Sequence, residues 1–460
     1  MDDVELTFLG GAGTVTGSKH LLQSGTFRVL VDAGVFQGEK EFRLLNWEPF
    51  PVQPKSISTI LITHAHNDHV GYLPVLVRNG FAGEVLATEA TIKLAEIVLR
   101  DGAFLAERDA AHAAAGGYSK HNPPLPLFTI DDVERALKLF RIVDYDTDYE
   151  LAEGWTANWT RAGHILGSAS IRVQTPAGSV LFSGDLGRTA HPVLRARQVP
   201  PGADVVLVES TYGDREHFEP TGAAHEPLAD LIRRTARRGG SVLIPAFAVD
   251  RTEVVLKAIT DLLRAGRIPQ LPVYVNSPMA LAALRVYRDP RFAAELRPDL
   301  DVEGFVDLPS LHEVRSTEDS IKLNNPKMPC IIISSSGMAT GGRVLHHLEH
   351  LLPEDRNAVV LTGYQAIGTR GRALADGAKH LKMHGRQVPA RAEILIDEEF
   401  SVHADASELL DWLAALTPAP RQVYCVHGDP ASAAALARAA GTRLNLATEV
   451  AAHGQTVRIG

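Results

Sequence analysis

Cysteine is scarce in this chain, which contains only two cysteines among 460 residues. Cys330 and Cys425 each lie inside an apolar run, which favours buried free thiols over a disulfide and predicts a reducing cytoplasm. No run of about eighteen apolar residues is present, so we expect no membrane-spanning helix. The opening residues Met1-Asp2-Asp3-Val4-Glu5 are acidic and lack the basic and apolar segments of a signal peptide. We therefore predict a cytoplasmic protein without structural disulfides.

Positive charge is also in deficit. The 46 Lys and Arg residues are outnumbered by 55 Asp and Glu residues, which gives a formal net charge of -9. This balance disfavours a protein whose whole surface binds nucleic acid, but it does not exclude a local basic cleft. A hydrophobic content of 45% is ordinary for a globular protein. The chain is longer than one hydrophobic core ordinarily accommodates, which predicts two domains.

Apolar periodicity divides the chain into three stretches. The first is rich in strands, predicted over Val4–Leu9, Phe27–Asp32, Ile57–Ile62, Ser168–Val173, Ser179–Phe182 and Val205–Val208, with helices over Thr91–Arg100 and Ile130–Phe140. From about Gly213, strands and helices alternate regularly, which is typical of a parallel sheet covered by helices. The last stretch returns to the opening style, with strands over Glu393–Ile396 and Gln422–Val426 and a helix over Ala406–Leu413.

The densest chemistry lies in the run His64-Ala65-His66-Asn67-Asp68-His69. It directly follows the predicted buried strand Ile57–Ile62, so it lies where a strand passes into a loop. Three imidazoles and a carboxylate this close together suit Zn²⁺, and Mn²⁺ or Fe²⁺ less specifically. The alternative is that these are solvated loop histidines. That interpretation suits a lone His better than a group of residues with this spacing. The run predicts a metal site.

Three other strand ends offer the additional ligands that a dinuclear site needs. His164 lies in a glycine-flanked loop before a strand, whereas Asp185 and His427 each follow a strand. Each signal is weak alone, because a strand-end Asp is also a common turn residue or helix cap. Strand ends of one sheet nevertheless open onto one edge. Two metal ions about 3.5–4 Å apart need a bridging carboxylate, which we predict to be Asp185.

Together these residues resemble the successive motifs of the metallo-β-lactamase superfamily, beginning with Asp32 and ending with Asp185. Three further segments resemble motifs A, B and C of its β-CASP branch, whose members process nucleic acids, with Glu209, His403 and His427 as the motif residues. Other similar segments are Pro245-Ala246-Phe247-Ala248, Asn276-Ser277-Pro278-Met279-Ala280, Ser335-Ser336-Gly337-Met338 and Thr362-Gly363-Tyr364-Gln365. A His at motif C goes with RNA-acting members of the branch, so His427 points to RNA.

The resemblance implies an α/β architecture, namely an αββα metallo-β-lactamase fold with an inserted α/β β-CASP domain. We expect the first domain over residues 1–212 and 389–460 and the inserted domain over residues 213–388. The chain resembles the compact bacterial relatives of the eukaryotic pre-mRNA cleavage nuclease more than the RNase J family. We expect the active site in a cleft between the domains, which would admit a single strand and exclude a stiff duplex.

The same resemblance implies a ligand set for two Zn²⁺ ions per chain, with Mn²⁺ as the alternative ion. One ion would be held by His64, His66 and His164, the other by Asp68, His69 and His427, with Asp185 shared. A hydroxide bound to both ions would attack the phosphorus. Asp32 would orient a histidine or the nucleophilic water. His403, paired with Glu209, would be the general acid; a structural histidine capping the helix from Ala406 is the alternative.

Candidate substrate contacts lie in the predicted inserted domain. The segment Ala366–Arg391 contains six Lys and Arg residues, among them Arg370 and Arg372, against the single acid Asp376. A solvated hinge segment is the alternative. Ser335, Ser336, Arg343 and Tyr364 are further candidates for gripping a phosphate, although a tight strand-to-helix turn explains the serine loop equally well. We assign no ligand role to His346, His347 and His350. His380 and His384 have helical spacing, and we expect them to be solvated or to face RNA.

The predicted reaction is metal-dependent hydrolysis of phosphodiester bonds in single-stranded RNA. We expect internal cleavage that leaves a 3′-hydroxyl and a 5′-phosphate, with a 5′-to-3′ exoribonuclease of RNase J type as the close alternative. A metal-dependent thioesterase or lactonase would use the same ligand cluster, and a catalytically silent RNA-binding scaffold is a third class. The oligomeric state is left open, a homodimer included.

Overall fold

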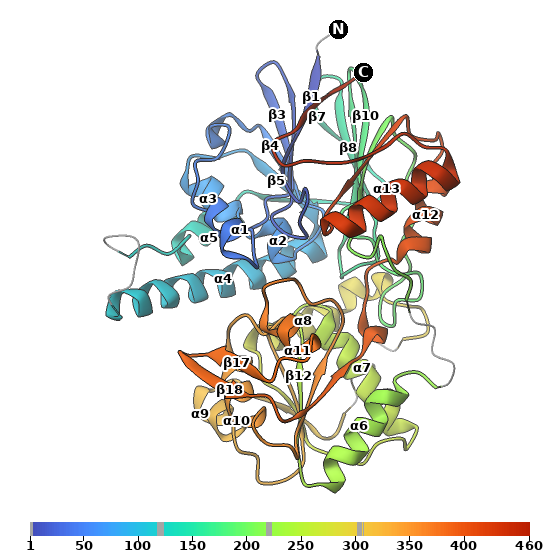
Figure 1. Ribbon diagram of the computed structural model, residues 1–460. Helices are drawn as coiled ribbons and strands as arrows, with labels where there is room; N and C mark the ends of the chain where they lie inside the picture. The colour runs from blue at the N-terminus through green and yellow to red at the C-terminus, as the bar shows by residue number, and fades with distance from the viewer. Residues whose placement is uncertain (1–2, 117–123, 218–222, 301–305, 307) are drawn as a thin grey trace. The chain divides into compact units, whose positions relative to one another are not determined.

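The computed structural model describes residues 3–116, 124–217, 223–300, 306 and 308–460 (Figure 1). The chain divides into two compact units. The first unit comprises Met1–Glu216 and Val402–Gly460, and the inserted unit comprises His217–Ser401. In the part of the chain that is described, no helix combines the length and the apolar character that crossing a membrane requires.

Two seven-stranded sheets form the centre of the first unit. The first sheet has the order β22 (Thr456–Ile459), β1 (Val4–Gly10), β2 (Lys19–Ser24), β3 (Phe27–Val31), β4 (Thr59–Leu61), β5 (Glu84–Thr88) and β6 (Phe140–Val143). The second has the order β21 (Thr448–Val450), β20 (Gln422–Val426), β11 (Val205–Glu209), β10 (Gly178–Phe182), β9 (Ala169–Thr175), β8 (Trp155–Arg161) and β7 (Asp148–Ala152). Both sheets mix parallel and antiparallel pairs.

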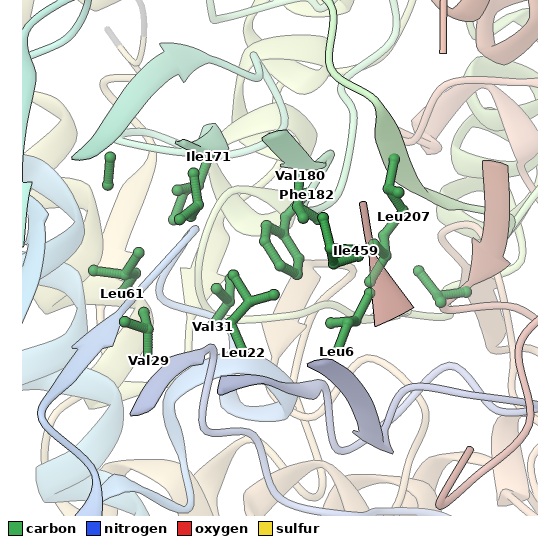
Figure 2. Packing of buried hydrophobic residues seen from close by; sticks show 14 of the residues in the cluster. Leu6, Leu22, Val29, Val31, Leu61, Ile171, Val180, Phe182, Leu207 and Ile459 are labelled. Atoms are coloured by element: carbon green, nitrogen blue, oxygen red, sulfur yellow. The ribbon is translucent and has the colours of Figure 1, made fainter. Parts of the chain in front are cut away.

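Apolar side chains from the two sheets pack against each other to form the main core (Figure 2). In β1, Val4, Leu6 and Phe8 are buried and alternate with less buried residues, as expected for a strand with one face on the core. Val180 and Phe182 of β10 supply the opposing face. The hydrophobic effect therefore holds the two sheets face to face.

Helices cover both outer faces of this sandwich. On the side of the first sheet lie α2 (Asn67–Val70), α3 (Leu73–Arg78), α4 (Glu89–Ala115) and α5 (Ile130–Leu137), and α4 contacts β5 and β6. On the side of the second sheet, α12 (Ala406–Ala415) and α13 (Pro430–Leu444) pack through a separate apolar cluster that includes Trp412 and Leu436. The short helices α1 (Lys40–Leu45) and η1 (Pro54–Ser56) complete the unit. The predicted αββα arrangement is confirmed.

Several predicted elements of this unit end differently. The helix predicted over Thr91–Arg100 extends over Glu89–Ala115. The helix predicted over Ile130–Phe140 stops at Leu137, because Phe140 begins β6 and pairs with Val85. The strand predicted over Phe27–Asp32 stops at Val31, because Asp32 adopts a positive φ of 61° that cannot continue a strand.

The inserted unit has a six-stranded sheet in which every neighbouring pair is parallel. Its order is β14 (Leu311–Glu313), β13 (Val273–Val275), β15 (Ile331–Ser334), β12 (Val242–Pro245), β16 (Ala358–Leu361) and β19 (Glu393–Ile396). The connecting helices are α6 (Glu226–Arg237), α7 (Arg251–Arg264), α8 (Pro278–Tyr287), η2 (Pro290–Glu295), α9 (Thr317–Lys322), α10 (Arg343–Leu351), α11 (Arg370–Ala375) and η3 (Glu398–Phe400). The predicted strand–helix alternation is confirmed.

Two features of the inserted unit depart from the sequence-based expectations. The strand Glu393–Ile396, which we expected in the first domain, pairs with β16, so the inserted unit continues to Ser401 rather than ending at residue 388. The helical spacing of His380 and His384 is misleading. These residues belong to a hairpin of β17 (His380–Met383) and β18 (Arg386–Pro389), in which the apolar residues alternate with period two.

Gly34 occupies one of the most crowded backbone positions of the first unit. A Cβ on this residue would lie 1.6 Å from the carbonyl oxygen of Asp68. Its own N–H donates to the Ser18 carbonyl at 3.0 Å, and Lys19 Nζ donates to its carbonyl at 2.6 Å. Because these contacts fix the backbone on both sides, the segment cannot retreat from an added side chain.

We therefore expect Gly34→Ala to lower the free energy of unfolding by about 3 kcal/mol or more, the upper range for overpacking a rigid site. Gly341→Ala is the matched control, because a Cβ there meets no atom within 4 Å. Denaturant unfolding followed by circular dichroism measures both variants. Equal stability of the two would show that the backbone around Gly34 yields.

Candidate metal centre

The predicted ligands come together although they derive from four separate parts of the chain. The run from His64 to His69 follows β4, His164 follows β8, Asp185 follows β10 and His427 follows β20. All of these strand ends belong to the first unit. The two sheets thus present their ligand-bearing loops at a common place.

The potential ligand atoms form two groups, each with all its atoms within 4.8 Å of one another. The first group consists of His64, His66, His164 and Asp185, and the second of Asp68, His69 and His427. In the first group, His66 Nδ1 lies 3.2 Å from His64 Nε2 and 3.3 Å from His164 Nε2. These distances between imidazole nitrogens are similar to those between neighbouring ligand atoms around one metal ion.

Asp185 faces both groups, with a different oxygen toward each. Its Oδ2 lies 3.6 Å from both His64 Nε2 and His164 Nε2. Its Oδ1 lies 3.3 Å from His69 Nε2 and 3.4 Å from His427 Nδ1. Each oxygen of Asp185 therefore faces a different set of potential ligand atoms.

Burial sets the protonation of the first group. Desolvation lowers the pKa of His64 and of His164 well below the usual value, so both imidazoles are neutral. Burial opposes ionisation of Asp185, but the histidines around it outweigh this effect and hold its pKa well below the usual value. Neutral imidazoles beside an ionised carboxylate are the forms that ligate metals, so the residues present fit a divalent ion.

The second group binds a proton in the absence of an ion. Burial disfavours the charged form of His69, but Asp185 and Asp32 outweigh it and raise the pKa of His69 well above the usual value. This proton must leave before the nitrogen can ligate, so metal binding is expected to release protons.

Asp32 orients His69 from behind the ligand shell. Its Oδ2 lies 2.7 Å from His69 Nδ1, which leaves Nε2 directed at Asp185. The carboxylate is itself fixed by Thr63, whose backbone N–H donates to Oδ1 at 2.8 Å and whose hydroxyl donates to Oδ2 at 2.9 Å. Such outer contacts fix the orientation of a metal-binding histidine. Thr63 carried no recognisable signal in the sequence.

His403 and Glu209 form a pair beside the first group. His403 Nδ1 lies 3.1 Å from Glu209 Oε1, and Glu209 is fully buried. The backbone N–H of Leu186 donates to the same Oε1 at 2.8 Å, which fixes the carboxylate. The ring centroid of His403 is 4.4 Å from that of His164. An imidazole whose ring is held by a buried carboxylate can transfer a proton at its other nitrogen.

Family models match almost the whole length of the chain. Residues 13–246 match the metallo-beta-lactamase superfamily, residues 252–374 match the Beta-Casp domain, and residues 387–450 match the Zn-dependent metallo-hydrolase RNA specificity domain. The chain belongs to the β-CASP branch of the metallo-β-lactamase superfamily. The predicted family and the predicted metallo-hydrolase class are thereby confirmed.

Relatives cover the full fold of this β-CASP protein. Ribonuclease TTHA0252 of Thermus thermophilus is 39% identical over 434 residues, which cover 93% of this chain and 94% of the relative. Transcription termination factor FttA of Methanosarcina mazei is 31% identical and matches 99% of this chain and 72% of its own length. A crystallised protein of unknown function from Enterococcus faecalis V583 shares the fold, with a TM-score of 0.53 at 12% identity over 99% of this chain and 100% of that one.

The candidate substrate residues lie in the inserted unit, His217–Ser401, which we call the β-CASP unit. Many of these residues already have hydrogen-bond partners. Arg343 donates to Asn276 Oδ1 at 2.7 Å and to the Val314 carbonyl at 3.0 Å. Arg370 donates to the Lys382 carbonyl at 2.9 Å, and Arg372 pairs with Asp376 at 3.0 Å. Each guanidinium therefore already forms hydrogen bonds or an ion pair within the unit.

The serine loop and Tyr364 lie at the carboxyl edge of the parallel β-CASP sheet. Ser335 follows β15 and donates to Ser277 Oγ at 2.8 Å, and the hydroxyls of Ser336 and Thr340 lie 2.9 Å apart. Tyr364 follows β16. Ligands of open parallel sheets bind at this edge.

Two backbone features of the metal centre escaped the sequence analysis. Asp32 and His427 both adopt positive φ values, 61° and 46°. Non-glycine residues rarely adopt this conformation, and where they do it often marks a functional site. Thr211 helps to hold His427 by donating to its carbonyl at 3.1 Å. Thr211 lies two residues after the motif A residue Glu209, which was the one available signal for its role.

Proposed function

We propose that this chain is a metal-dependent ribonuclease that cleaves single-stranded RNA internally by phosphodiester hydrolysis. The observation that carries the proposal is Asp185, whose two oxygens face two separate ligand groups beside the His403–Glu209 pair. The choice of RNA is supported by the ribonuclease of Thermus thermophilus and by the match to an RNA specificity domain over residues 387–450.

The centre would hold two divalent ions, with Zn²⁺ as the first choice and Mn²⁺ as the alternative. His64, His66 and His164 would ligate one ion, Asp68, His69 and His427 would ligate the other, and Asp185 would contact both. Bound divalent ions supply a nucleophilic water at neutral pH and offset charge on phosphoryl oxygens. Asp32 keeps the His69 ring aligned for this task.

His403 would protonate the departing 3′-oxygen. Its Nδ1 contacts the fully buried Glu209, so Nε2 is the nitrogen that faces away from this pair. Glu209 positions the ring through this contact. A water oxygen would bond to phosphorus as the P–O3′ bond breaks, and the proton would pass to the departing 3′-oxygen. The products would be a 3′-hydroxyl on one fragment and a 5′-phosphate on the other.

For RNA contact we propose Ser335, Ser336, Tyr364, Arg370 and Arg372. The Arg372 side chain is 41% exposed, so its guanidinium can contact a phosphate while it stays paired with Asp376. Arg343 would act indirectly, by holding the loop segments around it in place. Its guanidinium already donates hydrogen bonds to Asn276 Oδ1 and to two backbone carbonyls.

The test uses RNA labelled separately at its 5′ and 3′ ends, with Asp68→Ala and single-stranded DNA of equal sequence as controls. We expect internal fragments from RNA with the metal-loaded protein and none with Asp68→Ala. Mononucleotides released progressively from the 5′ end would instead make the chain an exoribonuclease. Intact RNA under both Zn²⁺ and Mn²⁺ would contradict the proposal, and turnover of a thioester would then identify the other hydrolase class.

A further inference from the structure

A second set of metal-binding side chains lies in the β-CASP unit. His346 and Glu349 lie one turn apart on α10, so their side chains share a helix face. His384 comes from the turn between β17 and β18. The ligand atoms of these three residues all lie within 4.8 Å of one another.

The contacts within this set are close. His384 Nδ1 lies 2.9 Å from Glu349 Oε2. The rings of His346 and His384 stack with their centroids 4.6 Å apart and an interplanar angle of 24°. Arg386 Nη1 lies 3.9 Å from the other Glu349 oxygen, but its side chain is 81% exposed and can move into solvent. Two imidazoles and one carboxylate are a usual ligand set for Zn²⁺, with water in the remaining position.

A tight turn and apolar burial hold the three residues in place. His384 and Gly385 form the two-residue connection of the hairpin, with φ values of 46° and 79°, as a type I′ turn requires. Leu381 and Met383 of the hairpin belong to the same apolar cluster as Leu345 and Leu348 of α10. The apolar packing thus brings His384 to α10 before any ion binds, which lowers the entropic cost of closing the site.

We propose that His346, Glu349 and His384 bind one Zn²⁺ ion that fastens the β17–β18 hairpin to α10, although the sequence alone indicated no ligand role for the two histidines. All three residues belong to the inserted unit, so this site is separate from the ligand groups around Asp185 and does not depend on the proposed ribonuclease activity. The His384 side chain is 40% exposed, so an ion can enter directly from solvent.

The decisive variant is His384→Asn, because asparagine is favoured in a type I′ turn and preserves the hairpin while removing an imidazole ligand. The matched control is His380→Asn, the same substitution at the exposed start of β17. Each full-length protein is equilibrated at one buffered free Zn²⁺ concentration and its zinc content per chain is measured. We expect His384→Asn to bind one ion fewer than the wild type and His380→Asn.

A second readout is hydrogen exchange over residues 380–389. Zn²⁺ is expected to slow exchange there in the wild type and in His380→Asn, but not in His384→Asn. Equal zinc content in all three proteins, or an equal loss in the control, would overturn the proposal. The same difference is expected in an Asp68→Ala background, so failure of the dinuclear centre and failure of this site are distinguishable.

Discussion

Asp185→Asn is expected to lower the rate of RNA cleavage about 10³-fold or more. The substitution keeps the shape of the side chain but removes the negative charge and one anionic oxygen. Because Oδ2 faces His64 and His164 while Oδ1 faces His69 and His427, an amide cannot serve both groups. Charge stabilisation by metal ions is worth several kcal/mol in such reactions, which corresponds to this factor in rate. Zinc content per chain and single-turnover cleavage of labelled RNA measure the two losses.

Asp204→Asn is the matched control for this prediction. Asp204 directly precedes β11, and its carboxylate accepts hydrogen bonds from the backbone N–H and the hydroxyl of Ser179 at 2.8 and 2.9 Å. It belongs to neither ligand group of the metal centre. The control is expected to keep its zinc and its activity while losing some stability. Full activity in Asp185→Asn would remove the bridging role from this residue.

His403→Ala is expected to keep both metal ions and to cleave RNA about 10²–10⁴-fold more slowly, the usual contribution of a general acid. The reason is that His403 belongs to neither ligand group but pairs with Glu209 next to His164. The sharpest measurement uses RNA in which sulfur replaces the bridging 3′-oxygen at one linkage. A thiolate leaves without protonation, so the variant should cleave this linkage nearly as fast as the wild type does.

Two results would contradict this assignment. Loss of zinc from His403→Ala would mean that His403 is a ligand and that the general acid lies elsewhere. An equal defect on the oxygen and sulfur linkages would show that His403 acts on something other than the leaving group, for example on the position of the RNA.

Much of the candidate metal centre was predictable from the sequence because several of its donor side chains lie close together along the chain. The run from His64 to His69 places four donors within six residues, and the apolar segment before it forces them to a strand end. Asp185 and His427 were recognisable at strand ends and His164 in a glycine-flanked loop, and the structure brings all three to this run. The αββα sandwich was predicted from the resemblance to the metallo-β-lactamase superfamily, whereas apolar periodicity by itself predicted only the order of strands and helices.

Only the tertiary structure decided the features that depend on contacts between distant segments. Strand Glu393–Ile396 belongs to the inserted unit because β16 lies beside it, and no local pattern specifies that neighbour. His384 has helical spacing from His380 yet lies in a hairpin turn beside Glu349 of α10, since strand pairing and burial of Leu381 and Met383 outweigh a weak local preference. Thr63 fixes Asp32, and Asp32 fixes His69, through hydrogen bonds that exist only after folding. Residue type and spacing predicted which side chains would lie together, whereas the fold decided how each one is held.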